Sequence, residues 1–206
     1  MMTDLNLGNP VRERYARRTD ITVTPVPEFA TILGVNLAVV TSDGFVVIAE
    51  RSTRAHVAGG KLHTSIAENL LRPVDSGPDG APDPFRCAMR AAQEELGLDL
   101  AIDELTFNAF GVEPALCQYS LLGCVHVSES KDEVQERWSL GTAKDKWESK
   151  NLIFVAHKPR EVAEYVQATM SRWSSIGLAT IVLSLYSSGY SHEAVRAKFD
   201  NVFTAG

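Results

Sequence analysis

The most constraining stretch of this 206-residue sequence runs from Phe85 to Leu98 and reads FRCAMRAAQEELGL. Its apolar residues recur at the spacing of an α-helix, which predicts one amphipathic helix with an apolar stripe that faces a core. The stripe consists of Phe85, Met89, Ala92 and Leu96. Glycine most easily takes up the left-handed conformation that ends a helix, so we expect this helix to stop at Gly97.

The charged residues of this helix share its other side. A rotation of about 100° per residue groups Ala91, Glu94 and Glu95, because they are related as i, i+3 and i+4. Two adjacent carboxylates repel each other unless a cation lies between them, and Mg²⁺ is a common divalent partner of oxygen ligands. The pattern therefore indicates a metal site or, as the plainer alternative, the solvated acidic face of a surface helix.

The string RAAQEELGL, residues 90–98, resembles the signature helix of the Nudix hydrolases, Arg-Glu-aliphatic-x-Glu-Glu-x-Gly-aliphatic. The residues that match are Arg90, Glu94, Glu95, Gly97 and Leu98, with Ala92 as a small version of the first aliphatic position. Ala91 departs from the pattern, because the family has a glutamate there that is usually a metal ligand and sometimes the base. The resemblance implies that Glu94 and Glu95 bind Mg²⁺ or Mn²⁺ and that Arg90 and Gly97 are structural.

The order of the expected elements extends the resemblance over about residues 30–190. Asp43-Gly44 is a turn signal between two apolar runs, which predicts a β-hairpin. The expected strands are 32–41, 45–50, 105–112, 121–127 and 151–157, and the expected C-terminal helices are 159–170, 174–186 and 191–199. The resemblance implies an α+β fold, a Nudix-like α/β/α sandwich with a mixed β-sheet. We expect one domain at 29–206, preceded by an N-terminal arm at 1–28.

The hairpin is followed by Gly59-Gly60-Lys61. A glycine pair lets the backbone approach a ligand closely, and a lysine can reach a phosphate as a point charge. A simple tight turn is the alternative. In the Nudix family, such a Gly-Gly pair followed by a basic or polar residue opens the loop before the signature helix. The resemblance therefore implies that Gly59, Gly60 and Lys61 contact the substrate.

The spacing before the signature helix departs from the family pattern. Pro82 stands eight residues before Arg90, where the family has a glutamate. Residues 72–84 contain several prolines, which cannot continue a helix or a central strand, so we predict an inserted loop there. We expect residues 65–70 to form a short helix capped by Ser65. Glu68 is then a candidate to replace the loop glutamate, with an ordinary surface glutamate as the alternative.

A carboxylate elsewhere in the chain has to compensate for Ala91 if the protein is catalytic. Glu148 is the leading candidate, ahead of Glu113 and Glu136, because many Nudix proteins carry a ligand or base near a late strand. The catalytic residues implied in this way are Glu94, Glu95 and Glu148. Residues 131–150 otherwise read as a charged connection.

The resemblance implies a magnesium-dependent hydrolase of the pyrophosphate bond in a nucleoside diphosphate linked to another moiety. The alternative is a catalytically impaired domain that binds a nucleotide or nucleotide-sugar as a sensor or binding module, and an interaction scaffold has least support. A carboxylate oxygen within about 5 Å of the metal position at Glu94 and Glu95 would favour catalysis. A gap filled by apolar atoms would favour the binding module.

Composition restricts the partners and the compartment. A net charge of −6 argues against broad electrostatic capture of a nucleic-acid duplex and leaves room for a small phosphorylated substrate. Three cysteines without a CxxC motif fit a reduced, cytoplasmic chain. Neither a secretory signal nor a membrane span is expected. Family members are often dimers, so a homodimer is one arrangement that the resemblance leaves open.

Overall fold

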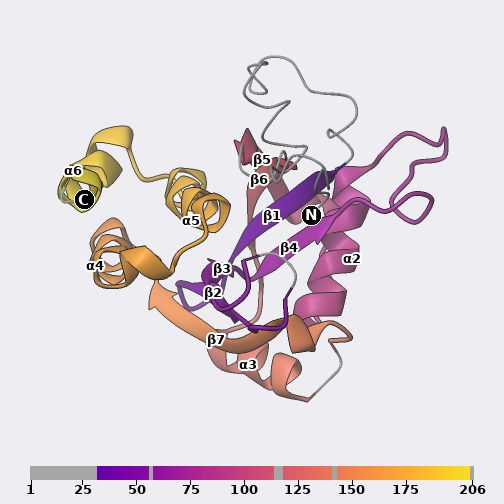
Figure 1. Cartoon of the computed structure of the whole chain (residues 1–206), viewed down its shortest axis with the longest axis horizontal. Coiled ribbons are helices and arrows are strands. Elements are labelled where there is room, and N and C mark those ends of the chain that lie inside the picture. The colour runs from indigo at the N-terminus through magenta and orange to yellow at the C-terminus, as the bar shows by residue number, and fades with distance from the viewer. Residues whose placement is uncertain (1–31, 56–57, 114–117, 141–142, 205–206) are drawn as a thin grey trace, which may run out of the picture.

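A mixed sheet of seven strands organises the computed structural model, which describes residues 32–55, 58–113, 118–140 and 143–204 (Figure 1). The strands are β1 Leu33–Val40, β2 Phe45–Arg51, β3 Leu62–Thr64, β4 Ile66–Asn69, β5 Leu105–Glu113, β6 Gln118–His126 and β7 Ser149–Ala156. The helices are α2 Pro84–Leu96, α3 Lys131–Ser139, α4 Pro159–Thr169, α5 Ser175–Ser187 and α6 His192–Thr204. Three short 3₁₀ helices, η1 Ile102–Glu104, η2 Lys146–Glu148 and η3 Met170–Arg172, lie between them.

Strand β1 is the centre of the sheet. The strand order is β3-β2-β1-β6-β5, and β4 also pairs with β1 while β7 pairs with β2. The β1–β6 pair is parallel, and the other pairs are antiparallel. Helices cover both faces of β1, and this explains why its sequence, LGVNLAVV, is almost continuously apolar.

Two apolar cores lie on opposite faces of the sheet. On one face α2 packs against β1 through residues that include Val35, Leu37, Ala88, Ala92 and Leu96. On the other face α4, α5 and α6 pack through residues that include Ala38, Ile48, Val166, Ile181 and Phe199. Figure 1 shows α2 on one side of the strands and α4, α5 and α6 on the other. The expected α+β sandwich with a mixed sheet is therefore confirmed.

Several local elements also match the sequence prediction. The hairpin joins β1 and β2 through a turn in which Gly44 has a φ of 81°, a left-handed conformation that glycine adopts without strain. Helix α4 begins with Pro159 at a position where its missing N–H costs nothing. Ser174 caps α5 by accepting a hydrogen bond from the N–H of Gly177. Residues 72–83 form a loop between β4 and α2.

Two sequence predictions are wrong. Residues 65–70 do not form a helix, because Ile66–Asn69 is strand β4 and its backbone pairs with β1 in a register that sets Glu68 opposite Val35. The available strand edge of β1 overrides the local helix signal. Residues 131–150 include helix α3, which the sequence analysis missed. Its capping box, Ser130 with Glu133, is a local signal that could have predicted it. The N-terminal arm at 1–28 lies outside the described residues.

Candidate functional site

Helix α2 carries the signature residues, and its ends are well defined. The carboxylate of Asp83 caps it by accepting hydrogen bonds from the N–H groups of Phe85 and Arg86, at 3.0 and 3.2 Å. Gly97 ends it with a φ of 71°, as the sequence predicted. The last turn of α2 thereby projects Glu94 and Glu95 toward β4, whose strand carries Glu68.

Ala91 and Glu95 lie on the buried side of α2, whereas the sequence analysis placed them with Glu94 on the side away from the core. Ala91 is 0% exposed and belongs to the apolar core between α2 and the sheet, and Glu95 is only 6% exposed. Glu94 is partly exposed. The small side chains of Ala88 and Ala92 let the helix pack closely on the sheet, so its buried arc is wider than the predicted apolar stripe. Ala91 and the two glutamates therefore do not share one solvent-facing volume.

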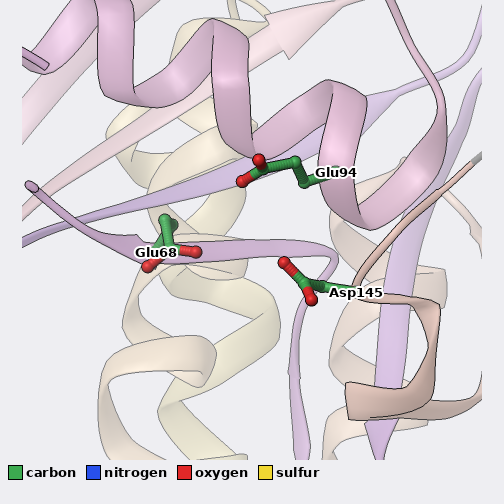
Figure 2. Close-up of side chains that lie close together, drawn as sticks. All are labelled: Glu68, Glu94 and Asp145. Carbon is green, nitrogen blue, oxygen red and sulfur yellow. The ribbon is translucent and has the colours of Figure 1, made fainter. Parts of the chain in front are cut away.

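Glu94 instead meets two carboxylates from other elements. Each of Glu68, Glu94 and Asp145 has an oxygen within 4.8 Å of the other two, and Figure 2 shows the three side chains around one space. Glu68 comes from β4, and Asp145 directly precedes η2. The N–H of Asp145 donates to the carbonyl oxygen of Glu94 at 2.9 Å, which attaches the two segments to each other. No spacing in the sequence singles out Asp145, so the sequence analysis missed it.

Arg90 connects this acidic cluster to the loop before α2. Its Nε and Nη2 donate to the two carboxylate oxygens of Asp75 at 3.0 and 2.8 Å, and its Nη1 donates to Glu94 at 2.7 Å. Burial is the largest single influence on Asp75 and would raise its pKa, but the hydrogen bonds from Arg90 and from the N–H of Leu71, together with the charge of Arg90, lower that pKa overall. The loop carboxylate that holds Arg90 in two bonds is thus Asp75, while Glu68 lies 3.5 Å from the guanidinium as part of the acidic cluster.

Glu95 occupies a different environment from Glu94. Its Oε1 accepts a hydrogen bond from the N–H of Ala67 in β4 at 2.9 Å, and its Oε2 has no hydrogen bond to the described residues. Burial raises the pKa of Glu95 to about 8. Desolvation likewise raises the pKa of Glu68. The carboxyl group of Glu95 therefore keeps its proton at neutral pH unless a cation approaches.

The three candidates for a replacement carboxylate have different positions. Glu148 lies in η2 and pairs with the buried Arg51, with 2.5 Å between Oε2 and Nη2. Its charge also acts on Glu68 and Glu95, where it adds to the larger effect of burial in raising the pKa of each. Glu113 accepts a hydrogen bond from Ser175, and Glu136 is exposed on α3. Of the three, Glu148 is therefore the one whose charge is felt by Glu68, a member of the cluster, and by the neighbouring Glu95.

A cavity of about 380 Å³ adjoins the acidic cluster, and Glu68, Glu148, Arg51 and Lys61 all line it. Lys61 Nζ also lies 3.5 Å from the carbonyl oxygen of Trp173. The glycines before Lys61 form a tight turn. Gly60 has a φ of 76°, and a Cβ on Gly59 would lie 2.9 Å from the carbonyl oxygen of Ala55. The cavity thus combines two cations with carboxylates, an arrangement that suits a phosphorylated ligand with a divalent ion.

His63 also lines this cavity, from β3. Its Nδ1 lies 3.0 Å from Thr64 Oγ1, and that hydroxyl donates its only hydrogen to the carbonyl oxygen of Ile66. His63 must therefore donate through Nδ1, which leaves Nε2 as an acceptor. Burial first, and then the charge of Arg51, lower the pKa of His63 to about 3. The imidazole is thus neutral at physiological pH.

No protein-family model matches the sequence, and no curated protein matches it either. Solved structures do match. A MutT protein from Methanosarcina mazei Go1 is 10% identical with a TM-score of 0.51, over 77% of this chain and 96% of that one. A bifunctional NMN adenylyltransferase/ADP ribose pyrophosphatase from Francisella tularensis, complexed with AMP and a manganese ion, is 12% identical with a TM-score of 0.50, over 86% of this chain and 47% of that one. A Nudix hydrolase from Nitrosomonas europaea is 15% identical with a TM-score of 0.48, over 79% and 93%.

The chain therefore has a Nudix-like fold, as the signature helix led us to expect. At these identities the likeness concerns the fold, and the chemistry has to be argued from the residues of this chain. Among the described residues, no helix is long and apolar enough to cross a bilayer.

Proposed function

We propose that this protein is a divalent-metal-dependent hydrolase of the pyrophosphate bond in a nucleoside diphosphate linked to another moiety. The observation that carries the proposal is the convergence of Glu68, Glu94 and Asp145 beside a cavity that also contains Arg51 and Lys61. In this proposal Glu68 and Asp145 compensate for the glutamate that is absent at position 91, and the proximity of their oxygens to Glu94, within 4.8 Å, supports catalysis. The Francisella tularensis structure, of which about half matches this chain in fold and which is complexed with a manganese ion, also supports the proposal.

The residues present fit a hard divalent cation. All three side chains of the cluster offer carboxylate oxygens, the ligands that Mg²⁺ and Mn²⁺ prefer. We propose Glu94, Glu68 and Asp145 as ligands, with Glu95 adding its Oε2 once it loses its proton. The bound ion would neutralise the diphosphate and lower the pKa of a water molecule.

The other residues of the cavity position and activate the reactants. Arg51 and Lys61 are placed to neutralise the phosphates, and Gly59 and Gly60 shape the turn that presents Lys61. We propose Glu148 as the base. It takes a proton from water as the water oxygen forms a new bond to one phosphorus atom. The bond from that phosphorus to the bridging oxygen breaks, and the leaving phosphate keeps the bridging oxygen and its electron pair.

The test measures phosphate release, with a coupled phosphatase, from a panel of nucleoside diphosphate conjugates in Mg²⁺, Mn²⁺ or EDTA. Glu94→Gln should lower the rate roughly a hundredfold or more, because metal ligands and bases commonly contribute that much. Glu136→Gln is the matched control, since Glu136 is exposed on α3. Metal-independent turnover, or equal rates for the two variants, would refute the proposal.

The second candidate function is a binding module that turns over slowly or not at all. The burial of Ala91 in the apolar core favours it, because that position contributes no oxygen to the metal. Metal-dependent binding of a conjugate by the wild-type protein, without phosphate release, would establish this alternative. A cytoplasmic location, which the cysteine content suggested, and a homodimer, which the resemblance leaves open, are further proposals.

A further inference from the structure

Two buried polar side chains, Asn36 and Ser120, form what we call the floor of the cavity, and neither has a hydrogen-bond partner among the residues that the structure describes. Asn36 in β1 is 4% exposed and Ser120 in β6 is 1% exposed, and both line the cavity. β1 and β6 run parallel with Gly34 opposite Ser120, so Asn36 and Ser120 project from the same face of the sheet.

The absence of a side chain at Gly34 makes room for two amides next to this floor. A Cβ at Gly34 would lie 3.2 Å from Asn69 Oδ1 and 3.3 Å from Gln118 Nε2. Those two amides line the same cavity and are hydrogen-bonded to each other at 3.2 Å. The floor and its edge therefore consist of neutral groups that can each donate and accept hydrogen bonds.

Buried polar groups normally find a partner within the fold, because leaving one unpaired is destabilising. Here the unpaired amide and hydroxyl face a cavity, so their hydrogen-bonding capacity is available to whatever fills it. None of the described residues that line the cavity is Phe, Tyr or Trp. That wall therefore offers no aromatic face on which a base could stack. Glu113 adds a carboxylate to the lining, which disfavours an anionic group.

We infer that this floor binds a sugar ring, and that the substrate class is a sugar joined to the diphosphate. Each hydroxyl of a sugar both donates and accepts a hydrogen bond, which matches Asn36, Ser120 and the amides beside them. The inference rests on the proposed function, because the diphosphate held near Arg51 and Lys61 would anchor the sugar over the floor.

The experiment is isothermal titration of the wild-type protein with CDP, CDP-glucose and CDP-choline. It uses Ca²⁺, another hard cation, in place of Mg²⁺ to fill the cluster. UDP-glucose and ADP-ribose extend the sugar series. The variants are Asn36→Leu and Ser120→Ala, with Asn151→Leu on the exposed part of β7 as the matched control. Thermal unfolding of each free variant accompanies the titrations.

We expect CDP-glucose to bind at least about tenfold more tightly than CDP-choline, as several added hydrogen bonds would allow. Asn36→Leu and Ser120→Ala should each lower the affinity for CDP-glucose roughly 3- to 10-fold and leave the affinities for CDP and CDP-choline unchanged. Both free variants should be at least as stable as the wild type, because each loses no protein hydrogen bond. If Asn36→Leu does not fold, the titration of Ser120→Ala alone tests the sugar assignment.

Equal affinities for CDP-glucose and CDP-choline would overturn the sugar assignment, as would variants that weaken all three ligands alike. In either case the wild-type protein would still bind CDP, and the proposed metal–diphosphate site would stand. Failure of CDP and every conjugate to bind would overturn both inferences, because the diphosphate anchor would then be missing.

Discussion

Replacing Glu95 with glutamine should stabilise the metal-free protein by an amount that grows with pH. Burial raises the pKa of Glu95 from 4.5 to about 8, so between these values the folded protein holds a proton that the unfolded chain has released. The stability that this group contributes is therefore fully present below pH 4.5 and is lost as the pH rises toward 8. Glutamine stays neutral throughout, and its carbonyl oxygen can still accept the N–H of Ala67.

The magnitude follows from the distance between the working pH and the ordinary pKa. At pH 7, which is 2.5 pH units above 4.5, the free-energy cost of keeping the proton on buried Glu95 is about 3.5 kcal/mol at about 1.4 kcal/mol per unit. The difference in unfolding free energy between Glu95→Gln and the wild type should thus be near zero at pH 4.5 and about 3.5 kcal/mol at pH 7.

The assay is urea unfolding in EDTA at pH 5, 6, 7 and 8, with Glu136→Gln as a control that should follow the wild type at every pH. Titration of other groups cancels in the comparison, because they are common to both proteins. A stability difference that does not change with pH would refute the reasoning, since it would mean that Glu95 titrates alike in both states. A variant less stable than the wild type at pH 7 would refute it as well.

Three further predictions concern the supports of the site. Asp75→Asn should lower the free energy of unfolding by about 3 kcal/mol, because it removes the charge of the buried carboxylate that accepts two hydrogen bonds from Arg90. Urea unfolding should show Asp79→Asn in the same loop to be nearly neutral. Ala91→Glu should also destabilise the folded protein, because it places a charge in an apolar core. Titration with Mn²⁺ should show that the variant binds the ion no more tightly than the wild type. Burial lowers the pKa of His157 from 6.5 to about 4. The stability that the neutral imidazole contributes is therefore fully present above pH 6.5 and is lost as the pH falls toward 4. In acid unfolding, His157→Asn should reduce this dependence of stability on pH.

The parts of the site that were predictable depend on local signals. The spacing of apolar residues indicated α2, and a glycine indicated its end. The matching motif also predicted a metal site at Glu94, and in the structure Glu94 lies close to two further carboxylates. The contribution of Glu148 was predictable only through the family resemblance, and its pairing with Arg51 was not.

The remaining parts depend on contacts between residues that are distant in the chain. Glu68 reaches the cluster because β4 pairs with β1, whereas the local sequence suggested a helix. Asp145 reaches it through a backbone hydrogen bond to α2. Asp75 reaches Arg90 from the loop before α2, because a loop can vary in length and still return a carboxylate to the helix.

By itself, the sequence determined the position of the elements with strong local signals: the hairpin around Gly44, helix α2 up to Gly97, and the C-terminal helices, although the last of these runs to Thr204 and not only to the expected residue 199. These signals act through φ preferences, capping and apolar periodicity, all of which operate within a few residues. Only the tertiary structure decided that Ala91 faces the core and that three carboxylates from separate elements surround one space. Both results depend on how helix and sheet pack, because packing sets which side of a helix loses its water and which distant side chains meet.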